Sequence, residues 1–125
     1  MREWIRELED RTQRFAKRSL ALCEQLPRTA TGLAVTGQLA DAAGSVAANH
    51  RACRRARSTR ELASKLQIVS EEVDETVLWL EILAGRQMGY QDVISELLVE
   101  ARELRAIFGR SLATTRRRLR EEEGS

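Results

Sequence analysis

This chain of 125 residues has few cysteines and no long apolar run, so neither disulfides nor a membrane can be expected to stabilise its fold. Two cysteines, Cys23 and Cys53, cannot form a framework of several disulfides, and the charged start of the chain does not look like a signal peptide, so we expect a cytoplasmic protein. The longest uncharged apolar runs are far shorter than the roughly 20 residues of a membrane span. One continuous hydrophobic core must therefore stabilise the fold, and a chain of this length is large enough to bury one.

Catalytic and metal-binding motifs are also scarce. The sequence contains no glycine-rich phosphate loop and no supported Ser-His-Asp or Cys-His set. Its single histidine, His50, excludes a di-iron bundle, which needs a Glu-x-x-His pair on each of two helices. His50 and Cys53 share a helical face, but such a pair is half a zinc site. We therefore predict no enzyme activity, no cofactor and no metal.

Helical periodicity is what the sequence has in quantity. Apolar residues at spacings of three and four predict helices over about residues 3–26, 31–55, 58–87 and 92–119. Pro27 ends the first helix because it lacks an N–H, and Ser58 with Glu61 matches a capping box that starts the third. Gly85 and Gly89 bracket the last turn. Helices of this length joined by short turns pack antiparallel, so the sequence predicts an all-α, up-down-up-down four-helix bundle as a single domain over 1–120, with a frayed acidic tail at 121–125.

The second predicted helix carries a regular core stripe. Its positions follow spacings of 4, 3, 4, 3 and 4: Val35, Leu39, Ala42, Val46, Asn49 and Cys53. The neighbouring residues are small, so another helix can approach closely. We expect Asn49 to be a buried polar residue that fixes the register by hydrogen bonding across the bundle.

The third predicted helix is apolar on more than one side. One stripe from Leu62 to Leu83 fills the core, while a second side carries Ile68, Trp79 and Ile82. A surface helix of a monomer would not be apolar nearly all round. We therefore expect a homo-oligomer with Ile68, Trp79 and Ile82 at the subunit interface.

Charge is balanced overall but strongly clustered. The chain has 21 Lys+Arg and 19 Asp+Glu. Arginines gather where the second predicted helix ends and the third begins: Arg51, Arg54, Arg55, Arg57 and Arg60. The planar guanidinium binds two phosphate oxygens at once, so this arginine turn is a candidate surface for a nucleic-acid backbone. Aromatic stacking partners are absent near it, which argues against base-specific binding. A purely solvated basic surface is the alternative.

Glu71, Glu72 and Glu75 form an E-E-x-x-E pattern. All-helical nucleotide pyrophosphohydrolases hold Mg²⁺ with such a helix and a later E-x-x-D helix. Here the later helix offers Glu100 and Glu103, with Glu in place of Asp, and no nucleotide clamp is evident. A Mg-dependent pyrophosphohydrolase is therefore a remote alternative, and ordinary pairing of these carboxylates with basic or polar neighbours is favoured.

Several of these segments together resemble a known family. The pattern includes Gln38-Leu39, Ser45-Val46, Asn49, Arg57-Ser58, Glu61-Leu62, Glu72, Glu75 and Leu78 to Leu80. It resembles the four helix bundle protein family, which includes proteins encoded by 23S ribosomal RNA intervening sequences, over about residues 10 to 90. The resemblance implies a left-handed bundle that assembles into a pentamer, and relatives that contact RNA and a reverse transcriptase. A proline common in the family is Ala47 here, and an acidic Ala-Glu-Gly is replaced by His50 to Cys53.

These observations favour a non-catalytic, oligomeric helical bundle. It would bind RNA or DNA, or a nucleic-acid-handling partner such as a reverse transcriptase, through its arginine turn. The alternative is a protein-interaction scaffold without nucleic-acid contact.

Overall fold

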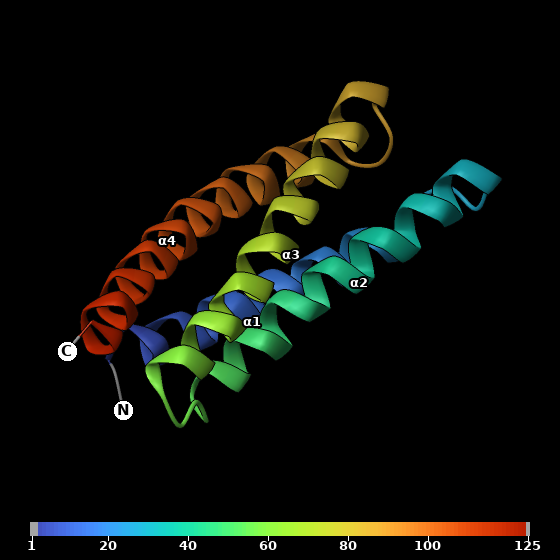
Figure 1. Cartoon of the computed structure of the whole chain (residues 1–125). Coiled ribbons are helices and arrows are strands. Elements are labelled where there is room, and N and C mark those ends of the chain that lie inside the picture. The colour runs from blue at the N-terminus through green and yellow to red at the C-terminus, as the bar shows by residue number, and fades with distance from the viewer. Residues whose placement is uncertain (1–2, 125) are drawn as a thin grey trace.

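Four antiparallel helices make up the chain (Figure 1). The computed structural model describes residues 3–124, and for Trp4 the backbone alone; residues 1, 2 and 125, which the predicted domain and tail include, lie outside this range. The helices are α1 (Glu3–Glu24), α2 (Ala30–Cys53), α3 (Thr59–Arg86) and α4 (Gln91–Glu123). The predicted all-α bundle is confirmed. None of the described helices is long and apolar enough to cross a membrane.

Local sequence explains where α2 and α3 begin. After Pro27, Thr29 caps α2 by accepting a hydrogen bond from the N–H of Gly32 at 3.1 Å. Gly32 is required there, because a Cβ at this position would lie 1.9 Å from the carbonyl oxygen of Pro27. Ser58 caps α3 by accepting from the N–H of Glu61 at 3.0 Å, as predicted.

The end of α3, at Arg86, lies one residue before the predicted end at 87, but Gly85 does not open the turn as expected. Gly85 lies inside the helix, and Gln87 takes the left-handed conformation, with φ of 56°. The N–H of Met88 bonds to the carbonyl of Leu83 at 3.0 Å, which is the hydrogen bond of a Schellman motif. Gly89, with φ of 82°, then turns the chain into α4 against Leu26 of the α1–α2 connection.

The core runs the length of the bundle between the four helices. Its largest fully buried side chains are Phe15, Leu22, Leu39, Leu62, Leu66, Leu80, Leu83, Ile94, Leu97, Leu104, Phe108 and His50. In α2 the buried positions include Ala42, Ala43 and Val46, so small side chains bring its backbone close to its neighbours. Val69, Val73 and Thr76 of α3 are completely buried, in agreement with the predicted stripe of that helix.

Each helix packs mainly against the helix next to it in the chain, and α1 and α4 contact each other least. Ion pairs connect these two helices. The guanidinium of Arg11 donates to both carboxylate oxygens of Glu100, at 2.8 and 2.7 Å, and also to Glu103. Arg18 pairs with Glu96 at 2.6 Å. Ion pairs therefore connect α1 and α4, the neighbouring helices that contact each other least. We call this boundary between the two helices the α1–α4 seam.

The last helix is longer than predicted. The sequence pattern predicts an end near residue 119 and a frayed segment at 121–125, but α4 continues to Glu123. Its final turn contacts the start of α3: the hydroxyl of Thr59 donates to Glu122 at 2.9 Å, and Arg60 forms an ion pair with Glu123. These contacts are between residues far apart in the chain, so local composition did not indicate them.

Candidate nucleic-acid interface

One end of the bundle gathers the arginine turn, the start of α1 and the end of α4 (Figure 1). The arginine turn at this end runs from the last turn of α2 to the first turn of α3. It carries Arg51, Arg54, Arg55, Arg57 and Arg60, and all five residues are exposed. The antiparallel order of four helices places the second turn, the first residues and the last residues together. We call this region the basic end.

Acidic partners neutralise part of the arginine turn. Arg54 reaches α1 and pairs with Glu9 at 2.6 Å, and Arg57 pairs with Glu61 of its own segment at 3.5 Å. Arg60 pairs with Glu123. Within the described residues, Arg51 and Arg55 take part in no ion pair or side-chain hydrogen bond, so these two guanidinium groups are the most available for an external anion.

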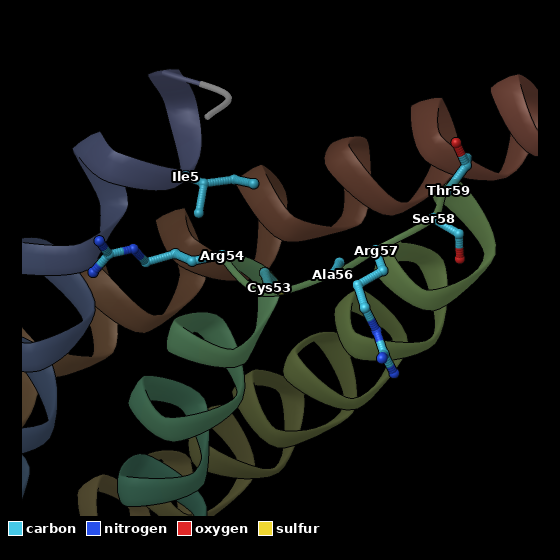
Figure 2. A pocket seen from close by; sticks show the side chains of 7 residues that line it. All are labelled: Ile5, Cys53, Arg54, Ala56, Arg57, Ser58 and Thr59. Atoms are coloured by element: carbon cyan, nitrogen blue, oxygen red, sulfur yellow. The ribbon is translucent and has the colours of Figure 1, made fainter.

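A hollow of about 480 Å³ lies beside the turn (Figure 2). Its lining comes from α1 and the α2–α3 connection: Ile5, Cys53, Arg54, Ala56, Arg57, Ser58 and Thr59. In Figure 2, Arg54 extends toward α1, whereas Arg57 extends in a different direction, along the outside of α3. The two guanidinium groups flank the hollow and do not converge in it, which suits contacts to phosphates spaced along a chain better than a pocket for one small anion.

The last third of α4 adds arginines that were not among the predicted site residues. Exposed guanidinium groups follow one another near its end: Arg110, Arg116, Arg117, Arg118 and Arg120. Arg116 lines a groove of about 320 Å³ between α3 and α4, together with Arg60, Ala63, Ser64, Gln67 and Leu119. The cluster was visible in the sequence as a basic run, but its position beside the arginine turn follows from the antiparallel topology. It enlarges the basic end.

His50, and not Asn49, is the buried polar residue of α2. Asn49 is half-buried, and its amide donates to the carbonyl and the hydroxyl of Ser45 on its own helix, both at 2.9 Å. The expected hydrogen bond across the bundle is therefore not the arrangement that the structure shows. His50 instead is completely buried, with its ring packed edge-on against Phe108 at a centroid distance of 5.6 Å.

The environment of His50 favours its neutral form. Neither ring nitrogen has a hydrogen-bond partner in the described part of the chain. Burial lowers the pKa of His50; the Glu9 carboxylate opposes this effect, and Arg54 adds to it. A protonated imidazolium at this position would be both desolvated and unpaired.

The two cysteines are buried free thiols. Desolvation raises the pKa of Cys53 to about 11, and the pKa of Cys23 likewise to about 11. Thiols of this kind are weak nucleophiles at neutral pH, because the thiolate is the reactive form. Among the described residues, no group of three or more His, Cys, Asp and Glu side chains is placed to hold a metal ion.

The predicted interface residues lie on the outside of α3. Ile68 is exposed, and Trp79 and Ile82 are half-buried. Trp79 also packs against the core, and its indole N–H donates to Glu75 at 3.4 Å. Leu78, which was not among the predicted residues, is 49% exposed on the same helix. The outer face of α3 therefore presents several large apolar side chains.

The carboxylates of the E-E-x-x-E pattern do not share partners with those of α4. Glu71 accepts a hydrogen bond from Gln67 at 2.6 Å, while Glu100 and Glu103 both bind Arg11. Burial raises the pKa of Glu72, and the nearby carboxylates of Glu75, Glu71 and Asp41 raise it further. Glu100 and Glu103, the carboxylates of the later helix in this pattern, therefore form ion pairs between α1 and α4.

Comparisons with known proteins agree with this geometry. The family model described as 23S rRNA-intervening sequence protein matches residues 7–110. A similar solved structure is that of a protein of unknown function from the S23 ribosomal protein family of Bacteroides thetaiotaomicron, with a TM-score of 0.77 and 23% sequence identity over 84% of this chain and 97% of that chain. At this identity the likeness concerns the fold. A comparison with curated proteins gives no match.

Proposed function

The chain belongs to the 23S rRNA-intervening sequence protein family, and from this premise we propose that it is a non-catalytic, oligomeric protein that binds nucleic acid through its basic end. The observation that carries the proposal is the meeting of two arginine clusters, from the α2–α3 connection and from the end of α4, on one end of the bundle. Phosphate is the partner chemistry that such a surface fits, because guanidinium groups bind phosphate oxygens in pairs.

The binding mode should be electrostatic and insensitive to sequence. Among the described side chains, the hollow beside the turn is lined by aliphatic, thiol, hydroxyl and guanidinium groups, and none of these is an aromatic ring on which a base could stack. We therefore expect contacts to the phosphates of RNA or DNA, single-stranded or duplex.

Oligomerisation would multiply this surface. Ile68 and Leu78 are exposed on the outside of α3, and burying them against a second subunit would remove apolar area from water. A pentamer is the assembly that the family resemblance implies. In a ring, each subunit would contribute its own basic end to a larger positive face.

A titration of labelled RNA by fluorescence anisotropy tests nucleic-acid binding. The variant Arg51→Gln/Arg55→Gln/Arg57→Gln removes charge from the turn, and Arg14→Gln/Arg28→Gln/Arg86→Gln removes the same charge from exposed positions outside the turn. Affinity should fall steeply between about 50 and 200 mM salt. The turn variant should bind more weakly, with a log–log salt slope smaller by about 0.7 to 0.9 for each phosphate that the turn no longer binds. The control variant should stay close to the unmodified protein.

Absence of binding at low salt would exclude this function. Equal reductions in affinity in the two variants would mean that net charge, and not the basic end, attracts the RNA.

The second candidate function is a scaffold that contacts proteins alone. The exposed apolar side chains Ile68 and Leu78 favour it, because such positions also suit a different protein partner. A nucleic-acid-handling enzyme, such as the reverse transcriptase that the family resemblance implies, would instead bind through the arginine turn. Retention of a specific partner protein after nuclease treatment, without RNA binding by the purified chain, would support the scaffold.

A further inference from the structure

The acidic last turn of α4 lies directly on the basic end. Glu122 accepts the hydrogen bond from Thr59, and Glu123 pairs with Arg60. Thr59 and Arg60 are the first two residues of α3. A carboxylate from the end of the chain thus occupies a position where a phosphate oxygen would bind.

The charges involved are placed against the preference of their own helices. Arg60 is a cation in the first turn of α3, where the helix dipole is positive, and the glutamates stand in the last turn of α4, where it is negative. Each placement is locally unfavourable by about 0.3 to 1 kcal/mol. The contact between the two helices compensates both, since the carboxylates gain the positive end of α3 and Arg60 gains a counterion.

The groove between α3 and α4, next to this contact, is lined by groups that can bind an anion. Arg60 and Arg116 stand on its two sides, and Ser64 and Gln67 supply further hydrogen-bonding groups. Arg116 donates to Gln67 across the groove. With the side chain of Glu123 moved away, Arg60 would be free to face the same groove.

We propose that this α3–α4 groove binds the phosphodiester backbone, and that the acidic last turn of α4 competes with the backbone for Arg60 and Thr59. The inference rests on the proposed nucleic-acid function and adds its regulation. Binding of a phosphate displaces Glu123, and the last turn of α4 then lacks the ion pair that holds it helical. The acidic turn thereby weakens the attraction of any polyanion that cannot displace it.

The test compares two neutralised variants of the full chain by RNA anisotropy. Glu122→Gln/Glu123→Gln removes the competing carboxylates, while Glu24→Gln/Asp92→Asn makes the same change in net charge at exposed residues of the opposite end. The first variant should bind RNA about two- to fivefold more tightly than the control, the range expected from one exposed ion pair. Its salt slope should match that of the control, because Arg60 binds a phosphate in both complexes once the backbone has displaced Glu123. Circular dichroism verifies that both variants keep the helical fold.

A second comparison, in a chain without the Arg60 guanidinium, tests whether the effect of the glutamates acts through Arg60. In a chain that carries Arg60→Gln, the substitutions Glu122→Gln/Glu123→Gln should change the affinity no more than the control substitutions do. An undiminished increase in affinity in this background would overturn competition for Arg60.

The remaining outcomes separate the two proposals. Equal RNA affinity of the two neutralised variants, with clear binding by the unmodified chain, overturns the competition and leaves the proposed function standing. Binding by Glu122→Gln/Glu123→Gln alone supports both proposals. No binding by any variant at low salt rejects the nucleic-acid function, and the competition with it.

Discussion

At the scale of single residues, His50 is the most unusual group in the core. It is completely buried next to Phe108, and neither of its nitrogens has a partner in the described residues. The Glu9–Arg54 ion pair lies close enough to influence its pKa in opposite directions. The folded state therefore tolerates the neutral imidazole and disfavours the imidazolium.

This arrangement predicts that acid destabilises the protein through His50. The pKa of His50 is lower in the folded than in the unfolded chain, so below the unfolded pKa, near 6.5, the unfolded state binds more protons. The free energy of unfolding should then decrease as the pH falls from about 6.5 toward the folded pKa, by at most about 1.4 kcal/mol per pH unit. Urea unfolding followed by circular dichroism across this range measures the effect.

The variant His50→Leu supplies the comparison, because it replaces the titrating imidazole with an apolar side chain of similar size. Its stability should vary less with pH in the same window. Parallel pH profiles for the two proteins would show that other groups cause the acid sensitivity.

At the scale of the helices, the ends decide how well the fold follows from local sequence. The start of α3 was predictable, because the serine and glutamate of a capping box lie within four residues of each other. Its end was predicted to within one residue, but the left-handed residue that closes the helix is Gln87 and not one of the two glycines that bracket the predicted turn. The neighbouring Gly89 is fixed instead by its close approach to Leu26.

Gln87 therefore offers a stabilising substitution. A residue with a Cβ has a steric cost in the left-handed region, and glycine does not. Gln87→Gly should raise the free energy of unfolding by about 0.5 to 1 kcal/mol. Gly85→Ala, inside the helix with open space around the added Cβ, should stabilise by a similar amount through helix propensity. Urea unfolding measures both variants. A decrease in stability in Gln87→Gly would mean that the glutamine side chain makes an interaction that outweighs its backbone strain.

The misplaced Asn49 shows a limit of reading a helix by a seven-residue repeat. A straight helix has 3.6 residues per turn, so its buried face drifts by about 20° per heptad relative to a strict 3.5-residue repeat. After Val46 the drift brings His50, and not Asn49, to the core. Two ion pairs of the arginine turn were also beyond prediction from sequence, because Glu9 and Glu123 are distant in the chain and meet Arg54 and Arg60 only through the tertiary fold. The pair of Arg57 with Glu61 is local, with the two residues four apart on one helical face, and follows from the sequence.

At the scale of the whole molecule, two surfaces remain for partners. The basic end carries the charge, and the outside of α3 carries apolar side chains. They differ in position and chemistry, so the proposed subunit interface and the proposed nucleic-acid interface rest on different residues. This separation allows each surface to be tested without the other.

We expect Ile68→Glu/Leu78→Glu to weaken self-association. A charge on each of two exposed apolar positions of α3 would have to be buried in a subunit interface, at considerable cost. In sedimentation equilibrium, the unmodified chain should form a multimer of its 14.2 kDa mass, and the variant should shift toward the monomer. Leu20→Glu/Val99→Glu is the matched control, because it also adds two carboxylates, at exposed apolar positions of α1 and α4. An unchanged multimer in the α3 variant, or a monomeric unmodified chain, would contradict this interface.

The order of packing along the chain also bears on how quickly the molecule folds. Because each helix rests mainly on the next one, most native interactions need the closure of one short turn. Proteins rich in such local interactions fold in microseconds to milliseconds, since little loop entropy is lost before packing begins. The seam between α1 and α4 is the exception, as it joins the two ends of the chain. Its closure through Arg11 and Glu100 would therefore come late, after two helical hairpins have already formed.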